Sequence, residues 1–122
     1  MTSKTDLREN LSIPIFESTN ETELFQNQVL RPILKLQNDM YILVFRDYAL
    51  RIIPDFDLIE IDKKLDFVDQ SLQKDNSLKN TLIGMTIGML TLEETKTYLS
   101  DSKSFNKRII TMLSERIKSK IK

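Results

Sequence analysis

The chain has 122 residues, 30% of them charged and 40% hydrophobic, with equal numbers of basic and acidic side chains, which is typical of one globular domain. It contains no cysteine and no histidine, which excludes disulfides, zinc–thiolate sites and the usual general base near neutral pH. Two glycines and three prolines are too few for a turn-rich β architecture, so the composition favours helices.

The first part of the chain is predicted to be a flexible tail. Residues 1–19 are polar and lack sustained hydrophobic periodicity, except for the apolar segment SIPIF at residues 12–16. No secretory signal is recognisable in this region, and the longest apolar run, residues 40–45, is too short to cross a bilayer. We therefore expect a cytoplasmic protein in which residues 20–122 form a single helical domain.

A long helix is predicted to open this domain. Asn20 suits the N-cap position, and Glu23 lies three residues on, as in a capping box. Helical spacing of apolar residues then continues to about Ile53, and residues 40–45 are apolar nearly all round, so we expect them to be the most buried. Pro32 removes one backbone donor, so the helix either bends there and continues, which we favour, or breaks.

Four further helices complete an all-α prediction with no convincing strand. Thr91 and Glu94 form a second capping box, TLEE, which separates the third helix from the fourth. The fold class is therefore a small bundle of about five helices around a long proline-kinked helix. The later helices are expected at residues 57–74 (cap Asp55 or Asp57), 77–90 (cap Asn76 or Ser77), 92–100, and from Ser102 or Ser104 to the end of the chain, with Phe105, Ile109, Met112, Leu113, Ile117 and Ile121 on one face.

Two glutamines lie on or beside the apolar face of the first helix. Buried amides need hydrogen-bond partners, so Gln26 and Gln37 could bind a ligand or the backbone of a partner. More often such a glutamine caps a nearby helix end or lies at the edge of the core. A pocket beneath the Pro32 bend, lined by Gln37 and Tyr41, is the corresponding ligand-site hypothesis.

Gly84 and Gly88 lie four residues apart on one helical face. Missing side chains allow another backbone to approach closely, either within the chain, which we favour, or across a dimer seam. Met85 beside them is adaptable apolar filler, useful in a core and also at a partner surface. The three residues are therefore candidates for a protein-binding surface.

Acidic residues gather in the second predicted helix, where Asp62, Asp66 and Asp69 share one face. Oxygen-only binding of magnesium or calcium is conceivable there, but no EF-hand loop or carboxylate–histidine motif is present. A solvated face is the better interpretation. We expect no metal site and no cofactor.

The last helix carries most of the positive charge. Residues 103–122 hold seven basic residues and one acid, Glu115, in a chain of zero net charge. This basic patch, Arg108, Arg116, Lys118 and Lys120, could contact nucleic acid or an anionic membrane. Pairing with the acidic helix of the same fold, or plain solvation, is favoured because no nucleic-acid-binding signature accompanies it.

Two segments, FQNQVLRPILKLQND (residues 25–39) and NSLKNTLIGMTIGMLTLEE (residues 76–94), carry a family resemblance. Residues 24–120 resemble a group of short bacterial helical proteins without characterised function, some of which carry the label glyoxalase. The resemblance implies a small all-helical protein and supplies no catalytic motif. Glyoxalases hold their metal ions through histidine, and this chain has no histidine and no strand pattern, so the glyoxalase activity is not expected.

The sequence thus favours a non-enzymatic helical protein that interacts with a protein partner or with a second copy as a homodimer. A small enzyme or ligand binder with a helical pocket is the alternative. A third hypothesis is anion binding through the basic C-terminal helix, with nucleic acid the less favoured ligand.

Overall fold

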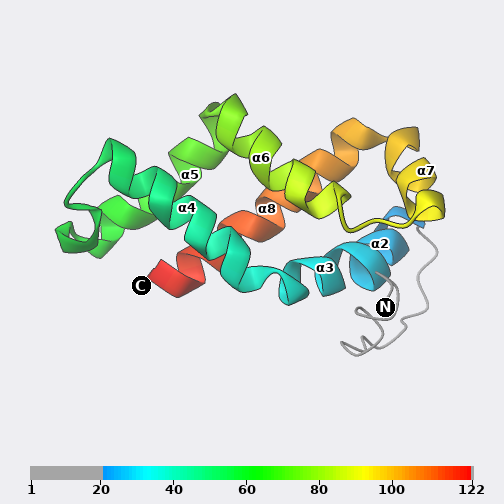
Figure 1. Ribbon diagram of the computed structural model, residues 1–122, viewed down its shortest axis with the longest axis horizontal. Helices are drawn as coiled ribbons and strands as arrows, with labels where there is room; N and C mark the ends of the chain where they lie inside the picture. Colours follow the sequence, from blue (N-terminus) through cyan, green and yellow to red (C-terminus); the bar gives the residue numbers. More distant parts are fainter. Residues whose placement is uncertain (1–20, 122) are drawn as a thin grey trace.

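The computed structural model describes residues 21–121, which are helical apart from short connections and contain no strand (Figure 1). This confirms the all-α prediction; the predicted tail, the SIPIF segment and the Asn20 cap lie outside the described residues. No helix in the described part is long and apolar enough to span a membrane. In chain order the elements are α2 (Glu21–Phe25), the π-helical turn η1 (Gln26–Leu30), α3 (Arg31–Leu36), α4 (Asn38–Ile52), the 3-10 turn η2 (Phe56–Leu58), α5 (Ile61–Lys74), α6 (Asn76–Ile87), α7 (Leu92–Ser100) and α8 (Ser102–Ile121).

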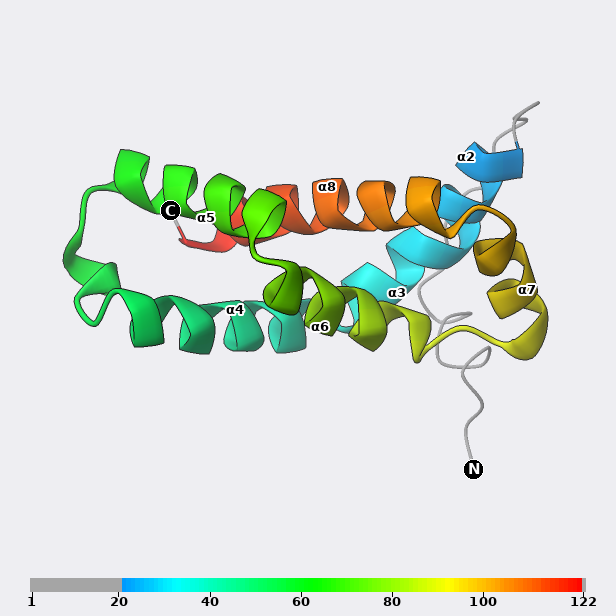
Figure 2. The ribbon, with the colours of Figure 1, turned by 90° about the horizontal axis from the view of Figure 1, so that it is seen from above.

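Helix α8 is the axis of the bundle, a role that was predicted for the first long helix. It packs against α4, α5, α6, α7 and η1, and Figure 2 shows it running along most of the length of the molecule. Its apolar residues recur at intervals of three and four, which is the spacing that places them on one face. That face is buried as predicted, through Phe105, Ile109, Met112, Leu113 and Ile117.

The helical path continues past Pro32, as predicted, because the turn before it widens. The Arg31 amide donates to the carbonyl of Gln26, five residues back, so the chain forms a π-helical turn over η1. This wider turn leaves room for the proline ring, which would otherwise crowd the carbonyl four residues before it. Pro32 itself is buried at the start of α3.

The interruption comes five residues later, at Gln37, where it was not predicted. Gln37 has φ −98° and ψ 12°, outside the helical region, and its carbonyl accepts from the amides of both Met40 and Tyr41. The chain changes direction between α3 and α4 at this residue (Figure 2).

The prediction that residues 40–45 are the most buried is only partly correct. Tyr41 and Phe45 are each 1% exposed, but Met40 is 55% exposed and Leu43 is 64% exposed. A helix on the outside of a bundle buries one face only, so the apolar residues on the other face of α4 meet solvent.

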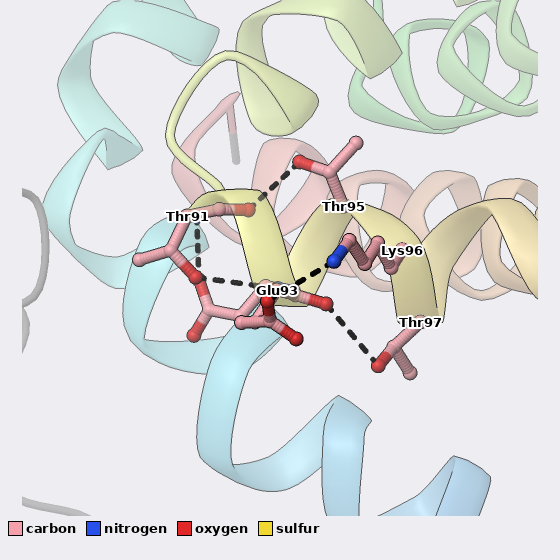
Figure 3. Close-up of polar contacts among 6 residues, drawn as sticks. Thr91, Glu93, Thr95, Lys96 and Thr97 are labelled. Carbon is pink, nitrogen blue, oxygen red and sulfur yellow. Dashed lines mark hydrogen bonds and ion pairs between the residues drawn. The ribbon is translucent and has the colours of Figure 1, made fainter.

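The capping box at the start of α7 is present as predicted. The Glu94 amide donates to the Thr91 hydroxyl at 3.2 Å, and the Thr91 amide donates to the Glu94 carboxylate at 2.9 Å. Figure 3 shows the neighbouring contacts, in which the Thr95 hydroxyl donates to the Thr91 carbonyl and Lys96 pairs with Glu93. The first turn of α7 thus has side-chain partners for amides that no helical carbonyl reaches.

Two other predicted caps are wrong. Helix α6 is capped by Asp75, rather than by either of the two following residues, since the Asp75 carboxylate accepts from the Leu78 amide at 3.1 Å. Helix α5 begins after Glu60 without a side-chain cap. Asp55 and Asp57 instead lie at the separate turn η2, which brings Phe56 into the core.

Replacing Thr91 with alanine removes the hydroxyl acceptor and should lower the free energy of unfolding by about 1 kcal/mol, as N-cap replacements usually do. Urea denaturation measures this difference. Thr97→Ala is the matched control, because the exposed Thr97 hydroxyl makes only a 3.5 Å contact with the Glu93 carbonyl. Equal stability of the two variants would show that the capping box adds nothing.

Candidate functional site

Gln37 and Tyr41, the residues predicted to line a ligand pocket beneath the Pro32 bend, belong to a buried polar network. The Gln37 side-chain amide donates to the carbonyl of Met85 at 3.1 Å and to the Tyr41 hydroxyl at 3.0 Å. The Tyr41 hydroxyl lies 2.8 Å from the hydroxyl of Thr86, which donates to the Leu82 carbonyl at 3.0 Å. The network connects the α3–α4 bend to the C-terminal end of α6.

The direction of each bond follows from the number of hydrogens. Thr86 donates its one hydroxyl hydrogen to the Leu82 carbonyl. Tyr41 must therefore donate to Thr86 and accept from Gln37. The carbonyl of Met85 is one of the last four of α6, which have no partner within an α-helix. Gln37 therefore caps a helix end, which is the structural alternative that the sequence offered for it.

Gln26 also has a partner within the fold. Its side-chain carbonyl accepts from the Arg108 guanidinium at 2.6 Å, across the interface of η1 and α8. In the described part of the chain, no buried side-chain nitrogen or oxygen lacks a hydrogen bond. Gln26, Gln37 and Tyr41 thus contribute to architecture, and a ligand pocket beneath the Pro32 bend stays an untested hypothesis.

A surface with a groove and exposed apolar side chains lies where α4 and α6 run side by side. A groove of about 750 Å³ separates the two helices and is lined by Leu43 and Tyr48 on one side and by Leu78 and Thr81 on the other. The exposed Met40 lies three residues before Leu43, and the exposed Gly84 and Gly88 follow Thr81 at intervals of three and four, which is the spacing of one helical face. We call this surface the α4–α6 face; it comprises Met40, Leu43, Thr81, Gly84 and Gly88.

Gly84 has no packing partner in the described part of its own chain. A Cβ atom built on Gly84 would meet nothing within 4 Å, whereas one on Gly88 would lie 3.3 Å from the Gly84 carbonyl oxygen. Because that oxygen belongs to the preceding turn of the same helix, the expectation of close packing against another part of the fold is wrong for both glycines. Met85 is half-buried against the core, and its carbonyl is held by Gln37.

Three of the four predicted basic residues lie along two adjoining grooves of α8. One groove, of about 540 Å³, is lined by Arg116 and Lys120 together with Arg31 and Lys35 of α3. The other, of about 450 Å³, contains Arg108 and shares Met112 with the first.

Lys118, the fourth predicted residue, faces the other way. Its ammonium group lies 2.9 Å from the Asp69 carboxylate of α5, and this contact and the Ser114 hydroxyl hold the pKa of Asp69 below its usual value. The favoured interpretation, pairing with the acidic helix, thus holds for Lys118. Asp62 and Asp66 are exposed, and the described residues contain no group of three or more side chains suited to hold a metal ion.

The contribution of α3 to the basic groove was missed in the sequence. Arg31 and Lys35 are four residues apart, so one helical face presents both, and this spacing is visible in the sequence. What the sequence does not show is that this face of α3 lies opposite Arg116 and Lys120, which share the same spacing on α8.

Comparison with models of known protein families, with characterised proteins and with solved structures finds no match to this chain. The resemblance of its two segments to short bacterial helical proteins stays a prediction.

Burial raises the pKa of Tyr41, so the contribution of this network to stability should depend on pH in alkaline solution. The folded protein holds the phenol proton to a higher pH than the unfolded chain, whose tyrosine has a pKa of about 10. The stability that Tyr41 contributes is therefore complete below that value and is lost as the pH rises toward the folded-state pKa.

Tyr41→Phe should lower the free energy of unfolding by about 1 kcal/mol at pH 8, because one buried hydrogen-bonded hydroxyl is removed. Above pH 10 the difference from the wild type should shrink, which urea titrations at several pH values can measure. A difference that stays constant from pH 8 to pH 11 would contradict the role of the Tyr41 proton.

Proposed function

We propose that this protein is a non-enzymatic interaction protein that pairs with a second copy of itself through the α4–α6 face. The observation that carries the proposal is Gly84, an exposed glycine within α6 at which an added Cβ atom would meet no described residue within 4 Å. Glycine costs about 1 kcal/mol relative to alanine inside a helix, so the position is unfavourable for the isolated chain. Close approach of the backbone of a second molecule to α6 would explain why this position has no side chain.

The shape of the α4–α6 face favours a second copy as the occupant. Met40 and Leu43 project from α4, whereas Thr81, Gly84 and Gly88 leave the neighbouring surface of α6 low. A two-fold axis through such a surface places the projecting side chains of each copy on the low strip of the other. Burial of each large apolar side chain would contribute about 1.5–3 kcal/mol when complete.

The charges along the groove do not oppose this arrangement. Asp47 and Arg51, the charged pair of α4 at this groove, bind each other one helical turn apart. Asp75 is engaged by the Tyr48 hydroxyl and by the Leu78 amide. An apolar seam with internally satisfied polar groups at its edge is the usual pattern of a protein interface.

An amphipathic helix of another protein could use the same surface. A small enzyme or ligand binder stays the second candidate, and the groove between α3 and α8 is where its ligand would bind.

Gly84→Leu should abolish self-association, because its side chain would occupy the space that the second copy needs. Among residues 21–121 the added Cβ meets nothing within 4 Å, so the fold should be retained. Sedimentation equilibrium over a range of concentrations measures the outcome. Thr111→Leu is the control: it places an exposed leucine on α8, which contributes no residue to the α4–α6 face.

A wild type that is monomeric at every concentration would rule out the homodimer. Equal weakening by the variant and its control would show that the α4–α6 face is not the seam.

Gly84→Ala should stabilise the monomer by about 0.5–1 kcal/mol, since alanine is the better helix former and its methyl group meets no described residue outside its own helix within 4 Å. Thermal unfolding of dilute protein measures the change. A destabilised Gly84→Ala monomer would mean that the glycine has a structural role inside the fold.

A further inference from the structure

The groove between α3 and α8 gathers four positive charges from two helices. Arg31 and Lys35 lie one turn apart on α3, and Arg116 and Lys120 lie one turn apart on α8. Side chains four residues apart share a helical face, so two pairs of cations line opposite sides of one groove. The sequence separation of the two pairs shows that only the tertiary fold creates this cluster.

Within the described part of the chain, none of these four cations forms an ion pair. The Arg31 Nε atom donates to the neutral side chain of Asn27 at 2.9 Å, and an Arg116 nitrogen lies 3.4 Å from the Asn38 side-chain oxygen. By contrast, Arg46, Arg51, Lys96 and Lys118 elsewhere in the molecule each contact a carboxylate.

Two acidic residues, Asp39 and Glu115, also line the groove, so its six charged side chains leave an excess of two positive charges. Burial of the half-buried Arg116 lowers its pKa, and repulsion by Arg31 lowers it further. Both effects oppose the charged guanidinium, and the negative charge of a bound anion would offset them.

We infer that the groove between α3 and α8 binds a phosphate group of a small molecule, held by Arg31 and Arg116 and supported by Lys35 and Lys120. Two planar guanidinium groups can each donate two parallel hydrogen bonds to phosphate oxygens, and the lysines add point charges. The excess of two positive charges matches a doubly charged phosphate. The volume of about 540 Å³ lies within the range of small-molecule sites.

A nucleic-acid strand fits the groove less well. The lining residues include no aromatic side chain on which a base could stack. Asp39 and Glu115 would repel a continuous phosphate backbone, although a single phosphate group can avoid them. The inference goes beyond the proposed self-association and uses a different surface, so Gly84→Leu should leave phosphate binding unchanged.

Titration of ¹⁵N-labelled full-length protein with inorganic phosphate and with pyrophosphate, at constant ionic strength, tests the site. We expect saturable shifts of backbone amides around Arg31 and Arg116, and tighter binding of pyrophosphate than of phosphate. Each of Arg31→Gln and Arg116→Gln should weaken binding roughly tenfold, the effect of losing a hydrogen bond to a charged group. Arg116→Lys, which keeps the charge but loses the planar fork, should restore only part of the affinity.

Lys103→Gln is the matched control, because it removes one charge from the same helix at an exposed position outside this groove. Equal weakening by Lys103→Gln and Arg116→Gln would overturn the site. Arg31 is exposed, so Arg31→Gln should fold normally and report on binding even if Arg116→Gln does not.

Two further arms identify the source of the phosphate group. Shifts of the same amides with vesicles containing phosphatidic acid, but not with phosphatidylcholine alone, would support a lipid headgroup as the ligand. Binding of a single-stranded oligonucleotide without binding of phosphate or pyrophosphate would overturn the inference in favour of nucleic acid.

Discussion

The arrangement of the helices depends on the hydrogen bonds of Gln37, because this residue ends α3 and at the same time holds the C-terminal end of α6. Its side-chain amide reaches the Met85 carbonyl, and Tyr41 continues the contact to Thr86 inside the core. Both Tyr41 and Thr86 are fully buried, so the loss of any partner would leave a polar group without water.

The same contact positions both candidate surfaces. It holds α4 beside α6, which creates the α4–α6 face, and it sets the angle at which α3 leaves α4. That angle brings Arg31 and Lys35 opposite α8. The α4–α6 face and the cationic groove thus both follow from a single bend, although their residues come from different helices.

Local features of the fold could be predicted from the sequence because they depend on neighbouring residues. The capping box of Thr91 and the buried face of α8 need only a cap residue or a helical period. The break at Gln37 could not be predicted, since it depends on a partner 48 residues away, Met85. For the same reason the apolar residues 40–45 gave no sign of which side chains would face solvent.

The candidate site was predictable to a similar extent. The basic character of α8 is visible in the sequence, but the separation of Lys118 from Arg116 requires knowing where α5 lies. Gly84 and Gly88 share a spacing that indicates close approach, and the spacing does not say whether the approaching backbone belongs to the same molecule. Only the three-dimensional arrangement distinguishes these alternatives.

The central place of α8 affects how the protein folds during its synthesis. Helices leave the ribosome in chain order, and α8 emerges after every other described helix that it contacts. Until then the apolar faces of α4, α5 and α6 lack the surface that covers them. We therefore expect these apolar faces to be exposed until α8 has left the ribosome and can pack against them.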